Sequence, residues 1–120
     1  MRKPELRLRT RQFAGQVVRL YIAFPLRRAE VAVLGKQMLR SGTSVAANYR
    51  EASRARSRNE FISNIEQCAP EADETQLWLE VLRDDCGVNL PEISVLWQEA
   101  DELIAIFVTM SKNTKNNDET

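Results

Sequence analysis

Histidine is absent from the sequence. Its absence excludes Ser-His-Asp triads, Cys-His pairs, histidine-ligated zinc and the Glu-x-x-His motif of di-iron helix bundles. General acid–base catalysis near neutral pH would need a Glu, Lys or Cys with a strongly shifted pKa. We therefore expect that the protein is not an enzyme and that it uses no cofactor and no metal.

Cysteine, glycine and proline are scarce, with two, four and four copies in 120 residues. Few glycines and prolines favour long helices over a loop-rich β protein. Cys68 and Cys86 would lie about 27 Å apart on one helix, too far for a disulfide, so we expect free, buried thiols in a reducing cytoplasm. No signal peptide and no membrane-spanning run is recognisable, which predicts a cytoplasmic protein with no membrane partner.

Four segments repeat apolar residues at helical spacing, over about residues 8–24, 27–52, 57–85 and 89–111. Each apolar stripe is too narrow to stand alone, and the connections between segments are short. The sequence therefore predicts an all-α, up-down-up-down four-helix bundle. We expect one domain over residues 1–111, followed by a disordered polar tail over residues 112–120.

Local signals place the ends and irregularities of these helices. Ser57 and Glu60 have the spacing of a capping box, and Gly87 suits the position after a helix C-terminus. Pro70 falls inside the third segment, where we expect a kink and not a break, since the stripe stays in phase. Gly42 lies among small polar residues; it either breaks the second helix or lets two helix backbones approach closely, and the stripe resuming in phase favours one helix.

Charge is divided unevenly along a chain that holds 17 basic and 17 acidic residues. Residues 1–60 have a net charge of +10 and residues 61–120 a net charge of −10. Either the basic half packs on the acidic half, within or between chains, or the basic half presents a nucleic-acid surface, and both can hold. The candidate phosphate contacts are Arg27, Arg28, Arg50, Arg54, Arg56 and Arg58. No aromatic residue is placed among them to stack on bases, with the one possible exception of Tyr49, so such binding would have low sequence specificity.

Two polar ladders follow helical spacing in the second and third segments. The first is Arg40, Ser44, Asn48 and Glu51, and the second is Glu60, Asn64, Gln67, Glu71 and Glu74. They predict either solvated surface or a network of hydrogen bonds and ion pairs between helices. The alternative is that Arg40 lines a ligand or phosphate site, and a metal held by the Glu residues is disfavoured without histidine.

These residues also carry a resemblance to a known family. The pattern R-S-x-x-S-x-x-x-N-x-x-E begins at Arg40 and is unusual within a helix. Together with residues 24–25, 34–39, 71–75 and 78–82, it resembles the bacterial 23S rRNA-intervening-sequence proteins over about residues 10–110. Pro70 departs from the family pattern, which usually continues the third helix there without a proline. The residues expected in a structural polar network are Arg40, Ser41, Ser44, Asn48, Glu51, Glu71 and Glu74.

The resemblance implies a four-helix bundle that assembles as a homopentamer, with no known catalytic activity. Some members of the family are encoded within insertions in 23S rRNA genes. Its relatives include accessory proteins of diversity-generating retroelements, which bind nucleic acid and a reverse transcriptase, so RNA, DNA and a reverse transcriptase are candidate partners. A ring suits the divided charge, because a basic half can meet the acidic half of a neighbour. The alternative is a purely structural or protein-interaction module.

Overall fold

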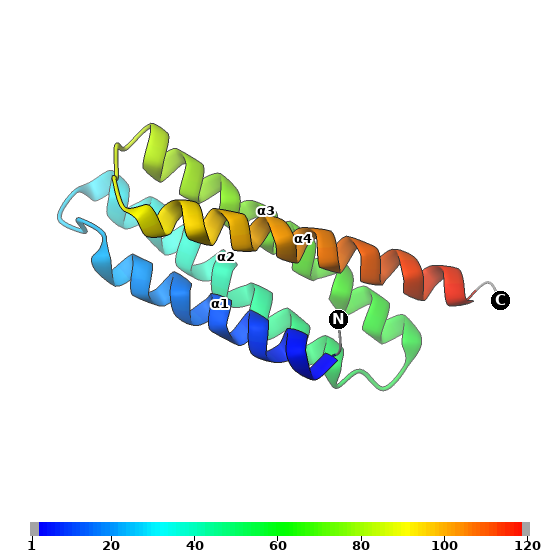
Figure 1. Ribbon diagram of the computed structural model, residues 1–120. Coiled ribbons are helices and arrows are strands. Elements are labelled where there is room, and N and C mark those ends of the chain that lie inside the picture. The colour runs from blue at the N-terminus through cyan, green and yellow to red at the C-terminus, as the bar shows by residue number, and fades with distance from the viewer. Residues whose placement is uncertain (1–2, 119–120) are drawn as a thin grey trace.

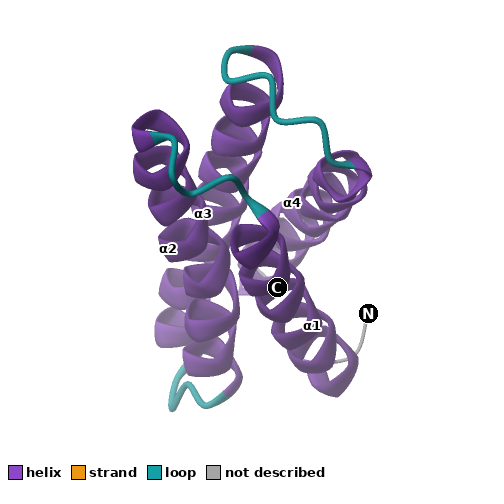
Figure 2. Cartoon of the chain, turned by 90° about the vertical axis from the view of Figure 1, so that its left-hand side faces the viewer, coloured by secondary structure: helices purple, strands orange, loops and turns teal. Residues whose placement is uncertain are grey.

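The computed structural model describes residues 3–118, which form four helices and no strand. They are α1 (Lys3–Ala23), α2 (Ala29–Ser53), α3 (Arg58–Asp84) and α4 (Pro91–Asp118). The helices run along one axis of a body that measures 53 × 21 × 20 Å (Figure 1). Figure 2 shows the connections as short loops at the two ends of the bundle. The predicted all-α four-helix bundle is confirmed.

The apolar stripes of the sequence form one continuous core. The first stripe consists of Phe13, Val17 and Leu20 on α1 and of Phe24 directly after it, all buried. Tyr49 of α2 reaches the centre of the bundle and contacts Phe107 of α4, with ring centroids 6.2 Å apart. Successive helices pack closely on one another, whereas the first and last helices, α1 and α4, pack together less extensively.

Gly42 marks the closest approach of α1 and α2. It lies within a continuous α2 and is buried, so it does not break the helix. A Cβ atom added at this position would lie 2.6 Å and 2.9 Å from the two methyl carbons of Val17. The small residues of this segment therefore serve the helix contact that the sequence predicts.

Local hydrogen bonds fix both ends of α3. The Ser57 hydroxyl accepts a hydrogen bond from the backbone N–H of Glu60 at 3.1 Å, which confirms the predicted N-cap. The Glu60 carboxylate accepts from the backbone N–H of Arg56 at 3.3 Å, one residue earlier than in the standard capping box. After the helix, Gly87 has a φ of +69°, and the N–H of Val88 donates to the carbonyl of Leu82 at 2.9 Å. The bond joins residues six positions apart, one more than in a Schellman motif, and glycine avoids the strain of the left-handed backbone at this turn.

α3 continues without interruption through Pro70. Because proline has no N–H, the carbonyl of Glu66 loses the hydrogen bond that would come from residue 70. Pro70 is exposed, so water can reach this part of the helix surface. The expectation that proline would not split the helix is met.

We predict that Pro70→Ala stabilises the protein. Alanine restores the missing donor and removes a residue that costs up to about 3 kcal/mol in a helix interior. The gain should appear as a higher urea midpoint with an unchanged slope of the unfolding curve. Ala105→Pro, at an exposed position of α4, is the reverse control and should destabilise the protein; equal stability of wild type and Pro70→Ala would contradict this account.

The C-terminal segment differs from the expected disordered tail of residues 112–120. α4 continues to Asp118, while residues 119–120 lie outside the described part of the chain. This part of α4 contacts α3: Lys115 forms an ion pair with Glu66, and the Ser111 hydroxyl lies 3.4 Å from the same carboxylate. The pKa of Glu66 is lowered, mainly because the Lys115 side chain donates a hydrogen bond to its carboxylate.

Candidate nucleic-acid interface

The arginines proposed as phosphate contacts lie in two groups. Arg50 and Arg54 end α2, and Arg56 stands in the connection to α3, with Arg58 at the start of that helix. The other group, Arg27 and Arg28, precedes α2 at the opposite end of the bundle. The structure therefore separates the six residues by the full length of α2, which is about 37 Å for 25 residues.

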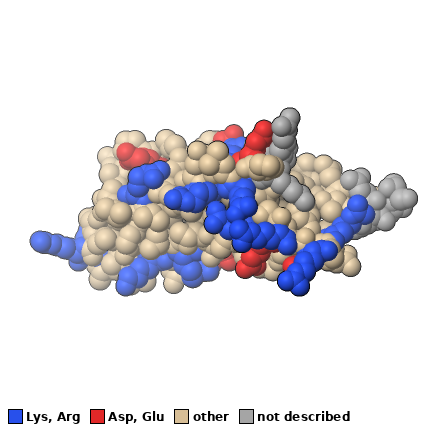
Figure 3. Space-filling model, turned by 90° about the horizontal axis from the view of Figure 1, so that it is seen from below, with Lys and Arg blue, Asp and Glu red and all other residues tan. Residues whose placement is uncertain are grey.

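The two groups differ in how far carboxylates neutralise them. Arg28 forms an ion pair with Glu30 at 2.7 Å. Arg50, Arg54 and Arg56 are exposed and make no ion pair with any carboxylate of residues 3–116. Seen from below, the molecule shows basic side chains from one end to the other and few acidic ones (Figure 3). Much of the basic charge thus remains open to an outside partner.

Tyr49, which the sequence left as a possible stacking residue, is not available to a ligand. Its side chain has no exposed surface and packs on Phe107. Burial raises the pKa of Tyr49 to about 12. The helical period explains the correction, since Tyr49 lies on the inner face of α2 while Arg50 points outward.

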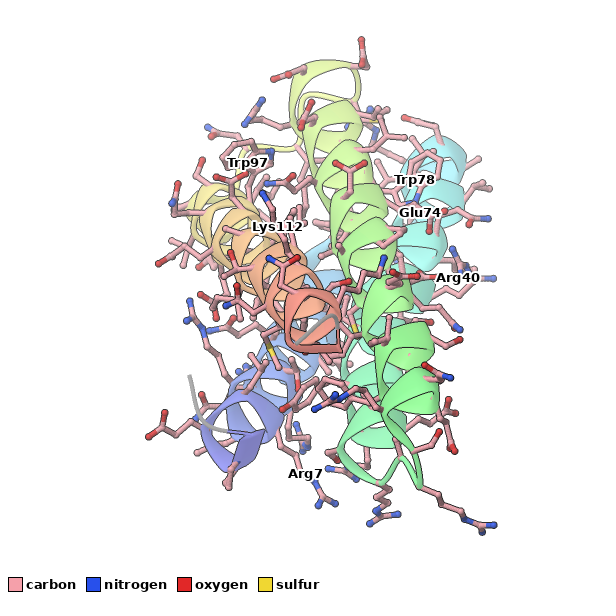
Figure 4. The ribbon with its side chains drawn as sticks, turned by 90° about the vertical axis from the view of Figure 1, so that its right-hand side faces the viewer. Arg7, Arg40, Glu74, Trp78, Trp97 and Lys112 are labelled. Atoms are coloured by element: carbon pink, nitrogen blue, oxygen red, sulfur yellow. The ribbon has the colours of Figure 1, made fainter. Side chains whose placement is uncertain are left out.

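The polar ladders join α2 to α3 at their centre. Arg40 forms ion pairs with Glu74 and, at 3.6 Å, with Glu71 (Figure 4). The buried hydroxyls of Ser41 and Thr75 lie 2.8 Å apart and share a hydrogen bond. The Arg40 guanidinium is thus occupied by two carboxylates, which favours a structural role over a phosphate site.

The remaining ladder residues stay outside this network. The Ser44 hydroxyl donates to the carbonyl of Arg40 within its own helix at 2.8 Å. Within the described residues, neither Asn48 nor Glu51 bonds to α3 through its side chain.

Three contacts that hold α4 in place were missed by sequence reasoning. Arg9 donates two hydrogen bonds to the Glu99 carboxylate, at 2.7 Å and 2.6 Å, which joins α1 to α4. This hydrogen bonding raises the pKa of Arg9. On α3, Gln76 donates to Asp101 at 3.2 Å and to the carbonyl of Trp97 at 3.1 Å. The indole N–H of Trp97 donates to Glu80 at 2.9 Å.

Outside the arginine groups, the features that bear on chemistry are a buried cysteine and a hollow between two helices. Cys68 is buried, and burial raises the pKa of its thiol to about 12, so almost no thiolate forms at neutral pH. Among residues 3–118, no group of three His, Cys, Asp or Glu side chains is placed to hold a metal. A hollow of about 330 Å³ between α1 and α4 is lined mainly by apolar side chains, with Arg19 and Glu92 at its edges. Within the same described range, no helix has the length and apolar character needed to cross a bilayer.

Comparison with known proteins identifies a family and a solved structure that are similar to this chain. Residues 3–117 match the family model described as 23S rRNA-intervening sequence protein. A crystal structure of a protein of unknown function from the S23 ribosomal protein family of Bacteroides thetaiotaomicron is similar, with a TM-score of 0.82 and 32% sequence identity. The similarity covers 93% of this chain and 99% of that chain. No curated protein matches the sequence.

Proposed function

This chain belongs to the 23S rRNA-intervening sequence protein family, and from its charge distribution we propose that it is a non-enzymatic scaffold that binds the backbone of RNA or DNA. The scaffold is a homopentamer, and the binding surface is the basic end formed by Arg50, Arg54, Arg56 and Arg58. Binding is electrostatic and has low sequence specificity, because guanidinium groups contact phosphates that every sequence carries.

One observation carries the nucleic-acid proposal: Arg50, Arg54 and Arg56 are not neutralised by carboxylates of the described chain. Three like charges close together repel one another, so they are favourable only where a partner supplies negative charge. Arginine presents a planar fork of donors that fits phosphate oxygens. If the arginines served structure alone, they would be expected to pair with carboxylates as Arg9 and Arg40 do.

The test is a retardation assay with a 20-base-pair RNA duplex at 0.1 M salt. Replacing Arg50, Arg54 and Arg56 with glutamine should weaken binding on the order of 100-fold or more, since each lost phosphate contact removes the release of about one counterion. The matched control replaces Arg83, Lys112 and Lys115, the three basic residues of the second half, and changes the net charge equally. Unchanged binding after replacement of the three arginines would overturn the assigned surface. An equal loss of affinity in the control variant would also overturn it, because net charge alone would then explain the effect.

The homopentamer is supported by the separation of charge between helices. α1 and α2 carry the basic half of the chain, while α3 and α4 carry the acidic half, so opposite faces of two copies attract each other. A contact between two different faces closes into a ring when the rotation between copies allows it.

Light scattering after size exclusion should report a mass near five times the 13.8 kDa of one chain. Because exposed charges are screened within about 10 Å at 0.1 M salt, the assembly should weaken as salt is raised. A monomer at all salt concentrations would contradict the proposed assembly. The nucleic-acid proposal would be unaffected, because the retardation assay tests it separately.

A further inference from the structure

The outer face of α2 carries a stripe of basic and small residues that leads to the arginine group at the end of the helix. The stripe follows spacings of four and three residues and consists of Lys36, Arg40, Thr43, Ala47, Arg50 and Arg54. It lies opposite the face of α2 that holds Met38, Val45 and Tyr49 in the core. From Lys36 to Arg54 it extends about 27 Å, at a rise of 1.5 Å per residue.

Shape and charge of this stripe fit a nucleic-acid backbone. Lys36 and the Arg50–Arg54 pair stand at its two ends, whereas its centre holds Thr43 and Ala47, which leave room for close approach. Arg40 is half exposed although it is paired with Glu74. The stripe carries four basic residues; Glu51 lies beside it, and Glu71 and Glu74 of α3 pair with Arg40. The basic side chains of the stripe that have no carboxylate partner among residues 3–116 are therefore Lys36 at one end and Arg50 and Arg54 at the other.

The aromatic residues argue for a duplex and against a single strand. Proteins that bind single strands stack successive bases on aromatic side chains, which contributes about 1–3 kcal/mol per base. Every phenylalanine is buried, and Tyr21, Trp78 and Trp97 pack against the core. Residues 3–118 therefore present no exposed aromatic platform, and the phosphates supply the attraction.

From the basic stripe on α2 and the packing of the aromatic residues against the core, we propose that the outer face of α2 binds the sugar–phosphate backbone of a double-stranded nucleic acid. The proposal rests on the proposed function and names its ligand class and docking helix. A duplex carries one charge per about 1.7 Å of its axis, so 27 Å of α2 faces about 16 phosphates, of which the side chains reach those on the near side. A rigid duplex also loses less conformational freedom on a rigid helix than a flexible strand does.

The experiment compares four probes of equal length at 0.1 M salt: a 20-base-pair RNA duplex, a 20-base-pair DNA duplex, and a 20-nucleotide RNA and DNA strand without self-pairing. Both duplexes should bind at least tenfold more tightly than either strand. If only the RNA duplex or only the DNA duplex binds at least tenfold more tightly than the strands, the proposal is supported and the type of duplex is identified. Equal or tighter binding of the strands would overturn the duplex class.

The docking helix is tested with Ala47→Glu, which places a carboxylate at the centre of the stripe on an exposed position. Duplex affinity should fall at least tenfold, while Thr109→Glu on the exposed surface of α4 should leave it within twofold. If Ala47→Glu binds normally but the Arg50, Arg54 and Arg56 variant does not, the α2 seat is wrong and the proposed function stands. If Ala47→Glu reduces the mass seen in light scattering, α2 is a contact between copies and the seat is overturned. Absence of binding to every probe would remove the proposed function itself.

Discussion

Gly42→Leu should lower the free energy of unfolding by about 3 kcal/mol or more, since extra carbons forced into a packed contact strain the surrounding structure. A Cβ at this position would already lie 2.6 Å from a methyl carbon of Val17, before the rest of the leucine is added. Val17 is buried and stiff because its side chain branches at Cβ, so α1 and α2 would have to separate. Urea unfolding followed by circular dichroism measures the loss.

Gly15→Leu is the matched control for this prediction. A Cβ at Gly15 meets the guanidinium ends of Arg11 and Arg19 at 3.2 Å, and both are far ends of flexible side chains. Leucine is the better helix former, so Gly15→Leu should leave stability unchanged or raise it by up to about 1 kcal/mol. The cycle of Gly42→Ala with Val17→Ala should show a favourable coupling, because Val17→Ala removes the atoms that clash. Additive effects in that cycle would contradict the close approach described for Gly42.

Phe107→Ala should lower the free energy of unfolding by about 3–5 kcal/mol, as expected for removing a buried aromatic side chain. Phe107 is 1% exposed and packs on the Tyr49 ring, which crosses the bundle from α2 to α4. The change leaves a cavity beside the Tyr49 ring, where α2 and α4 meet. Val108→Ala, at a side chain that is 54% exposed, should change stability by less than about 0.5 kcal/mol. Similar losses in the two variants would contradict the placement of Phe107 in the core.

Features that depend on neighbouring residues could be read from the sequence. The stripes of α1 to α4 follow the 3.6-residue period, and the Ser57 cap and the Gly87 turn involve residues at most six positions apart. In each case the residue type and its spacing dictate the local conformation. The fold class follows from these stripes, since four amphipathic helices with short connections must share one core.

Features that depend on distant partners could not be predicted. Arg9 and Glu99 are 90 positions apart, and Gln76 and Asp101 are 25 apart, so no spacing rule connects them. In the helical extension of α4, Lys115 pairs with Glu66, 49 positions earlier, a contact that only the packed bundle brings together. The arginines of the candidate interface were recognisable by composition, but which of them escape pairing is a property of the tertiary structure.

The basic residues of the molecule fall into two groups, those paired within the fold and those without a partner. Arg9, Arg40 and Lys115 act within the fold, where each joins one helix to another. Arg50, Arg54 and Arg56 have no such partner among the described carboxylates and face outward. These outward-facing arginines are the groups through which the proposed nucleic-acid binding would act.

The most direct test of this claim is the salt dependence of duplex binding, measured by fluorescence anisotropy from 50 to 300 mM salt. The logarithm of the association constant should fall linearly with the logarithm of salt concentration. Its slope should become less steep by about 2.7 when Arg50, Arg54 and Arg56 are replaced with glutamine, because each phosphate contact contributes about 0.9. An affinity that does not change with salt, or an equal slope in the wild type and the variant, would show that these arginines hold no phosphate.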